Sequence, residues 1–192
     1  MTIRTPSGDV EVERVLVAAG GHTQSLLGQS LGFVVYARTV AMFRLSAEEI
    51  QRLAGMPSMR CFGPKGADPY ILPPIRYPDG HVWLKLGSDP VDIPLESEGN
   101  IKDWFRSGGS IPVAEGLEQQ LLERIPGLHV EERRVVPCMT TFGKTGLPRI
   151  GQVSERVTVA FGCYGKSAKC SDELGRLGGM ALLGENHGAL AA

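Results

Sequence analysis

The chain has 192 residues, a formal net charge of −1 and 42% hydrophobic residues, which suffices for one domain or two closely associated ones. The mixed, nearly balanced charge argues against a protein that binds nucleic acid by electrostatic attraction. No run approaches the roughly 18 apolar residues of a membrane span, and no signal-peptide pattern opens the chain. The four cysteines lack metal-ligand spacing, so we expect a cytoplasmic protein with reduced thiols and no metal.

The first part of the chain predicts a hairpin, a buried strand, a short helix and a long strand. They span Thr2–Glu13, Val15–Ala19, a segment beginning near His22, and Phe33–Leu45. A hairpin that feeds a buried strand leaves that strand without a neighbour. We therefore expect the sheet partners of Val15–Ala19 to be missing from this chain or supplied by another.

The middle of the chain predicts further strands and helices. Ser46-Ala-Glu-Glu49 is a capping box that opens a helix ending at Gly55. Tyr77-Pro78-Asp79-Gly80 has the composition of a tight turn between two strands. The remaining ranges are strands at 70–75, 81–87 and 129–141, a short helix at 102–105 and an amphipathic helix at 112–125. These segments predict an α+β fold, in which mixed-sheet elements in the middle are bracketed by strand–helix segments at both ends.

A strand–loop–helix unit at Val157–Gly179 is the most informative segment. After a loop at Gly143–Gly151, an apolar strand ends at Gly162, and a helix is predicted from about Ser167 to Leu183. The first turn of such a helix offers backbone N–H groups and a positive dipole end to an electron-rich group. Gly165-Lys166-Ser167 could close a phosphate loop, although Ala160 stands where its first glycine belongs. The alternatives are a strand–helix corner with packing glycines and a loop that holds a cofactor ring.

Four segments in order resemble the D-amino-acid oxidase superfamily of FAD-dependent oxidoreductases. They are VLVAAGGHTQSLLG, YILPPIRYPDGHVWLKLG, PCMTTFGKTGLPRIG and AFGCYGKSAKCSDELGRLG, and they look most similar to monomeric sarcosine oxidase and N-methyl amino-acid oxidases. The resemblance covers the C-terminal portion of such a protein. It implies that residues 1–30 and 135–192 form part of an incomplete α/β FAD-binding layer, while residues 31–134 form an antiparallel substrate-binding sheet.

The resemblance also implies residues that contact FAD. The segments near the cofactor contain Gly20, Gly21, Gly162, Gly165 and Ser167. In the family, the helix that follows the last of them points its N-terminus at the pyrimidine end of the flavin, where a dipole stabilises developing negative charge.

A further family match concerns a cysteine. Cys138 matches the residue that bonds covalently to the flavin in sarcosine oxidases. The alternative for Cys138 is a small, buried strand residue, as free cysteine usually is, with FAD bound noncovalently.

Two lysines match residues that act on substrate or oxygen in the family, and a tyrosine is a further candidate. Lys85 matches a lysine above the flavin that assists reaction with oxygen, although an outward-facing strand lysine is the alternative. Lys169 matches a lysine that pairs with the substrate carboxylate, whereas Lys166 lacks a match and is expected in solvent. Tyr70 is a candidate for lining the substrate pocket, with a core or edge aromatic as the alternative.

The G-x-G-x-x-G fingerprint that receives the pyrophosphate of FAD does not occur in this sequence. We therefore expect a truncated or split protein, with a partner chain supplying that half. The implied reaction oxidises the C–N bond of an amine or N-methyl amino acid, and oxygen or another acceptor then reoxidises FAD. The alternative is a non-catalytic fragment or binding module.

Overall fold

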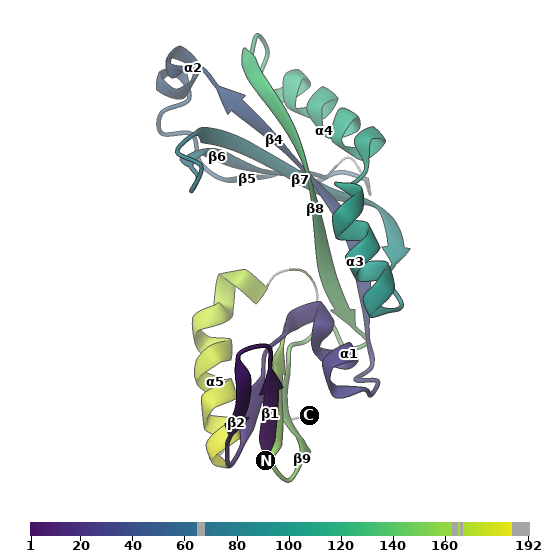
Figure 1. Cartoon of the computed structure of the whole chain (residues 1–192). Coiled ribbons are helices and arrows are strands. Elements are labelled where there is room, and N and C mark those ends of the chain that lie inside the picture. Colours follow the sequence, from purple (N-terminus) through teal and green to yellow (C-terminus); the bar gives the residue numbers. More distant parts are fainter. Residues whose placement is uncertain (65–67, 163–164, 166, 186–192) are drawn as a thin grey trace. The chain divides into compact units, whose positions relative to one another are not determined.

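The structure is a computed structural model that describes residues 1–64, 68–162, 165 and 167–185. The chain forms two compact units. Unit 1 comprises Met1–Val35 and Thr140–Ala192, and unit 2 comprises Tyr36–Met139. Strands and helices are mixed in this chain, which confirms the predicted α+β class (Figure 1).

Unit 1 contains two small sheets. β1 (Thr2–Thr5) and β2 (Gly8–Glu11) form the predicted antiparallel hairpin. A second sheet has the order β3 (Val15–Val17), β10 (Val157–Phe161), β9 (Arg149–Ser154). The expectation that β3 has no partner in this chain is wrong, because β10 pairs with it in parallel. Sequence separation hides such a partner, since parallel strands are joined by long connections.

Helix α5 (Ser171–Leu183) packs on the second sheet of unit 1 (Figure 1). Leu177 and Ala181 on the helix are buried against Ile150 of β9. The helix approaches the sheet closely at Gly178, where an added Cβ would lie 3.1 Å from the Cβ of Ala160 on β10. The other helical segments of unit 1 are short: η1 (Gly20–His22), α1 (Thr23–Leu27) and η2 (Ser167–Cys170).

Unit 2 is built on a five-stranded sheet with three helices. The sheet order is β5 (Met59–Arg60), β6 (Tyr70–Arg76), β7 (Val82–Pro94), β4 (Phe33–Leu45), β8 (Val130–Gly143). The helices are α2 (Ala47–Arg52), α3 (Glu98–Ser107) and α4 (Ile111–Arg124). β4 and β8 each begin in one unit and end in the other.

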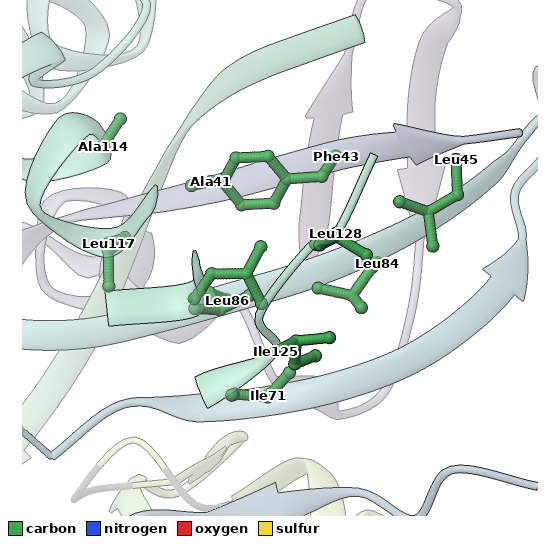
Figure 2. Close-up of a cluster of buried hydrophobic side chains, with 11 residues drawn as sticks. Ala41, Phe43, Leu45, Ile71, Leu84, Leu86, Ala114, Leu117, Ile125 and Leu128 are labelled. Atoms are coloured by element: carbon green, nitrogen blue, oxygen red, sulfur yellow. The ribbon is translucent and has the colours of Figure 1, made fainter. Parts of the chain in front are cut away.

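The main core of unit 2 lies between one face of the sheet and α4 (Figure 2). Side chains alternate along a strand, so every second residue of β4 and β7 points to this face. The buried members are Ala41, Phe43, Leu45, Ile71, Leu84, Leu86, Ala114, Leu117, Leu121, Ile125 and Leu128. The opposite face carries a second cluster of Val40, Met42 and Trp83, against which Tyr77, Val136 and Cys138 pack.

Candidate functional site

The predicted glycine segments of unit 1 come together at one edge of a sheet. β3 and β10 run in parallel with Val15 opposite Val157 and Val17 opposite Val159. Both strands therefore end at the same edge, where β3 leads into Gly20 and β10 into Gly162. In open α/β sheets, ligands bind beyond the carboxyl ends of parallel strands. This edge is the candidate cofactor site of unit 1.

Gly162, the first residue after β10, is packed tightly against Ser167. A Cβ added at Gly162 would lie 1.6 Å from Oγ and 2.2 Å from Cβ of Ser167, so only glycine fits beneath this serine. The hydroxyl of Thr141 donates a hydrogen bond to the carbonyl of Gly162, which fixes the loop to β8. Gly162, directly after β10, and Ser167, at the start of η2, therefore lie in close contact.

Gly165 has the left-handed backbone that favours glycine, with φ of +60°. A Cβ added there would lie 3.3 Å from Cγ2 of Thr140. The buried hydroxyl oxygen of Thr140 has no hydrogen-bond partner among the described residues. A buried hydroxyl in this state has unused hydrogen-bonding capacity beside the loop. Thr140 was not predicted, because nothing in its sequence neighbours distinguishes it from Thr141.

The loop after β3 forms a compact turn. Gly20 has φ of +53°, and its carbonyl accepts a hydrogen bond of 2.7 Å from the hydroxyl of Thr23. Gly21 and Thr23 are buried, so this turn is held from inside unit 1. The turn leads directly into α1 and places backbone, rather than long side chains, at the sheet edge.

The lysine predicted to pair with substrate lies just before α5. Lys169 is exposed on η2, and in the described part of the chain it makes no ion pair. The helix begins at Ser171 rather than near Ser167, and its N-cap residue Cys170 makes no side-chain cap. Asp172 and Glu173 occupy the first turn and complement the helix dipole. Lys166, on which the phosphate-loop interpretation depends, lies outside the described residues.

Unit 2 brings its predicted site residues to one face of the sheet, opposite the α4 core. Leu72 and Met42 are the register partners of Lys85 on the two neighbouring strands. The ammonium nitrogen of Lys85 lies 5.8 Å from the centroid of the Tyr70 ring. Cys138 packs in the cluster that contains Met42. The face thus holds a phenol, an ammonium group and a thiol, all half-buried.

Cys138 is held in place by a helix that the sequence did not connect to it. The indole N–H of Trp104 on α3 donates a 2.8 Å hydrogen bond to the backbone carbonyl of Cys138. The thiol itself is free and half-buried. The indole N–H group of a tryptophan usually has a hydrogen-bond partner when the side chain is buried. No sequence signal links Trp104 with Cys138, since they lie on different elements.

Charged groups at the rim of this face are paired. Asp79 accepts hydrogen bonds from the indole of Trp83 and from Arg134, whose guanidinium carbon lies 4.1 Å from the centroid of the Trp83 ring. The backbone N–H of His81 and these partners lower the pKa of Asp79. Burial raises the pKa of the Tyr77 hydroxyl. These groups stabilise the turn and its strands around the face.

Two further features of the described residues bear on the class of site. Within the described ranges, no group of histidine, cysteine and carboxylate side chains is arranged to hold a metal ion. The helices that the structure describes include none with the length and apolar character needed to cross a membrane.

A comparison with family models matches residues 2–178 to the DAO family, described as FAD dependent oxidoreductase. The comparison with curated proteins gave no match.

Solved structures with a similar fold include amino acid and amine oxidoreductases. The open form of NikD, an amino acid oxidase essential for nikkomycin biosynthesis, has a TM-score of 0.68 at 16% identity over 99% of this chain and 50% of that chain. A thermally stable mutant of fructosyl peptide oxidase has a TM-score of 0.68 at 15% identity, over 100% of this chain and 46% of that chain. L-amino acid deaminase from Proteus vulgaris has a TM-score of 0.59 at 14% identity, over 96% of this chain and 42% of that chain. The chain spans about half the length of the structures it matches.

Proposed function

The chain belongs to the DAO family of FAD-dependent oxidoreductases, and from that membership we propose that it forms part of a flavoenzyme that oxidises the C–N bond of an amine or N-methyl amino acid. The observation that carries the proposal is the parallel pairing of β3 with β10, which places the Gly20–Gly21 turn and Gly162 at the same carboxyl edge of the pair. That edge is where α/β folds bind their ligands.

The residues at this edge fit the ring end of FAD. Gly165 has no side chain to keep a ligand away from the backbone, and the buried hydroxyl of Thr140 beside it lacks a partner among the described residues. The sequence contains no G-x-G-x-x-G segment for the pyrophosphate. We therefore propose that Gly20, Gly21, Gly162, Gly165 and Ser167 hold the ring end, and that a partner segment carries the pyrophosphate site.

FAD, when bound, supplies the redox chemistry, accepting the two electrons released by oxidation of the substrate. The roles proposed for this chain are binding and electrostatic. The exposed ammonium of Lys169 pairs with the carboxylate of an amino-acid substrate. The ammonium of Lys85 supplies positive charge that favours reaction with oxygen. Tyr70 contributes to the substrate wall.

Cys138 is the proposed point of a covalent link to FAD. Its thiol is free and half-buried on the same sheet face as Lys85, and its backbone is fixed by Trp104. The matched control is Cys61, a second half-buried free thiol of unit 2, which packs against the α4 core.

The test measures flavin directly. The chain is purified with FAD, both alone and together with a G-x-G-x-x-G segment from a family member, and its visible absorbance is recorded. Yellow colour retained after acid precipitation, lost in Cys138→Ser and kept in Cys61→Ser, supports the covalent proposal. Colour released by acid leaves FAD binding supported and overturns the covalent link. A colourless protein under both conditions favours the alternative, a non-catalytic fragment or binding module.

The substrate proposal is tested in the complemented protein by hydrogen peroxide release from N-methyl amino acids and simple amines. Lys169→Ala should raise KM for substrates with a carboxylate and leave KM for simple amines unchanged. Lys102→Ala on α3, which removes a surface lysine 3.6 Å from Glu98, is the control and should change neither value. Equal KM values for wild type and Lys169→Ala on carboxylate substrates would show that Lys169 does not bind the carboxylate.

A further inference from the structure

Tyr70 and Lys85 are diagonal neighbours on adjacent strands. In the antiparallel β6–β7 pair, Tyr70 lies opposite Gly87, while Lys85 lies opposite Leu72. Residues offset by two positions share a face of the sheet, and long or aromatic side chains reach each other across that diagonal. Both side chains are half-buried on the face opposite the α4 core. The strand register therefore brings a ring and an ammonium group within reach.

Gly87 makes room for the Tyr70 ring. A Cβ added at Gly87 would lie 2.5 Å from Cε1, Cζ and Oη of Tyr70, inside the 3.0 Å limit that real Cβ atoms observe. The backbone of Gly87 does not have a positive φ, so no turn requires glycine there. Glycine within a strand often marks such a close approach. The ring lies directly against the strand backbone because this position has no side chain.

The ring of Tyr70 is the partner that the described chain gives to the Lys85 ammonium. The nitrogen lies 5.8 Å from the ring centroid, within the range of a cation–π interaction. Among the described residues, Lys85 makes no ion pair with a carboxylate. A carboxylate would neutralise the positive charge, whereas an aromatic face orients an ammonium group and leaves its charge in place.

We propose that Tyr70 is a positioning residue for Lys85, and that Gly87 is the position that allows it to be one. The ring, seated on the backbone of Gly87, fixes where the long lysine side chain presents its charge. The role of that charge in the reaction with oxygen rests on the function proposed above. The geometry of the Tyr70–Lys85 pair is independent of that function.

The geometric test is nuclear magnetic resonance of the purified chain with isotope-labelled lysine. The methylene protons on Cε, next to the ammonium group, are shifted upfield by the ring current when they lie at a ring face. The Lys85 Hε signal should therefore lie upfield of the Hε signal of Lys102, a surface lysine. Lys85→Arg assigns the signal. Tyr70→Phe should keep the upfield shift, and Tyr70→Leu should remove it. Gly87→Ala should also remove it, although Tyr70 is intact.

Each outcome decides the proposal. An unchanged Lys85 shift in Tyr70→Leu, or in a folded Gly87→Ala, overturns it. If Gly87→Ala does not fold, the contrast between Tyr70→Phe and Tyr70→Leu still tests the pair, and a shift lost in both overturns it too.

A second arm separates this inference from the proposed function. In the complemented holoenzyme, Tyr70→Leu and Gly87→Ala should slow reoxidation by oxygen by about tenfold, since misplacing a group by about 1 Å can cost up to about a hundredfold in rate. Lys102→Ala should not slow it. A lost ring-current shift with an unchanged oxygen rate would uphold the pairing and overturn the oxygen role of Lys85.

Discussion

Replacing Gly162 by alanine should destabilise unit 1 through a clash that a neighbouring side chain cannot relieve by rotating. The new Cβ would lie 1.6 Å from Oγ of Ser167, which can turn away, but also 2.2 Å from its Cβ, which cannot. To reach the 3.0 Å limit the two carbons must separate by at least 0.8 Å, which requires backbone movement. Overpacking of this kind costs about 1–3 kcal/mol in the free energy of unfolding.

Amide hydrogen exchange in β10 and α5 measures this cost, because both tryptophans lie in unit 2 and fluorescence would report the other unit. Ser167→Ala should not rescue Gly162→Ala, since its Cβ remains, whereas Ser167→Gly should. Gly175→Ala is the control: it lies on α5 with open space around it, so alanine should stabilise the helix by about 1 kcal/mol. Equal protection in wild type and Gly162→Ala, or failure of Ser167→Gly to rescue, would refute the argument.

Three further predictions concern unit 2. Leu117→Ala removes a side chain that is 2% exposed in the α4 core and should lower the free energy of urea unfolding by about 2–5 kcal/mol. Trp104→Phe deletes the hydrogen bond to the Cys138 carbonyl and should cost about 1 kcal/mol in the same assay, while Cys138 becomes more reactive to a thiol reagent. Asp79 has a pKa lowered from 3.8, first by the backbone N–H of His81, so it stabilises the fold above that pH and loses this contribution as the pH falls towards the folded pKa. Asp79→Asn should therefore flatten the acid limb of urea midpoints plotted against pH.

Elements with strong local signals were predictable from the sequence. The alternation from Phe33 to Leu45 predicted β4 with its observed bounds. The capping box predicted α2, whose N-cap Ser46 accepts a hydrogen bond from the backbone of Glu49. The helix ends at Arg52 rather than at Gly55. The side-chain cap fixes where α2 begins, whereas no comparable side-chain cap among the described residues fixes its end.

Elements with weak or contradictory local signals were underestimated. α3 begins at Glu98, although its first turns contain Gly99 and Asn100, which are poor helix formers. Ser97 compensates by capping the helix. β9 occupies Arg149–Ser154, partly inside the loop predicted from its glycines and prolines. The cap of α3 is a local contact, whereas β9 is held by its antiparallel pairing with β10, which overrides the local propensity for a loop.

The sequence allowed the candidate residues to be named, but it did not show which residues contact them. Lys85, Cys138 and the glycines were named from a family resemblance, and their roles stay predictions. Thr140, Trp104 and Gly87 were not predicted, because their significance depends on which residue lies opposite them. A hydrogen bond from α3 to β8, or a ring lying on a strand backbone, leaves no periodic trace in the sequence.

The pairing of Tyr70 with Lys85 depends on an irregularity in β6 that reverses the sheet face. Near the turn, Arg76 lies opposite Val82, and continuing that register for six residues would place Tyr70 opposite Ser88. The register shifts by one between Leu72 and Ile75, where the strand contains two prolines, so Tyr70 instead lies opposite Gly87. Prolines cannot donate hydrogen bonds to a sheet and are tolerated at such bulges. A shift of one residue moves every side chain on the far side of the bulge to the other face of the sheet.

The burial of the two isoleucines of β6 shows this change of sheet face. Ile71 and Ile75 are four positions apart in the sequence and would share a face of a regular strand. Ile71 is instead fully buried in the α4 core, while Ile75 is 45% exposed and lies opposite Trp83, a member of the other face. The same bulge therefore accounts for both the buried Ile71 and the placement of Tyr70 beside Lys85. The two consecutive prolines lie inside the strand predicted at 70–75, and the register shift at their position sets the arrangement of the candidate site in unit 2.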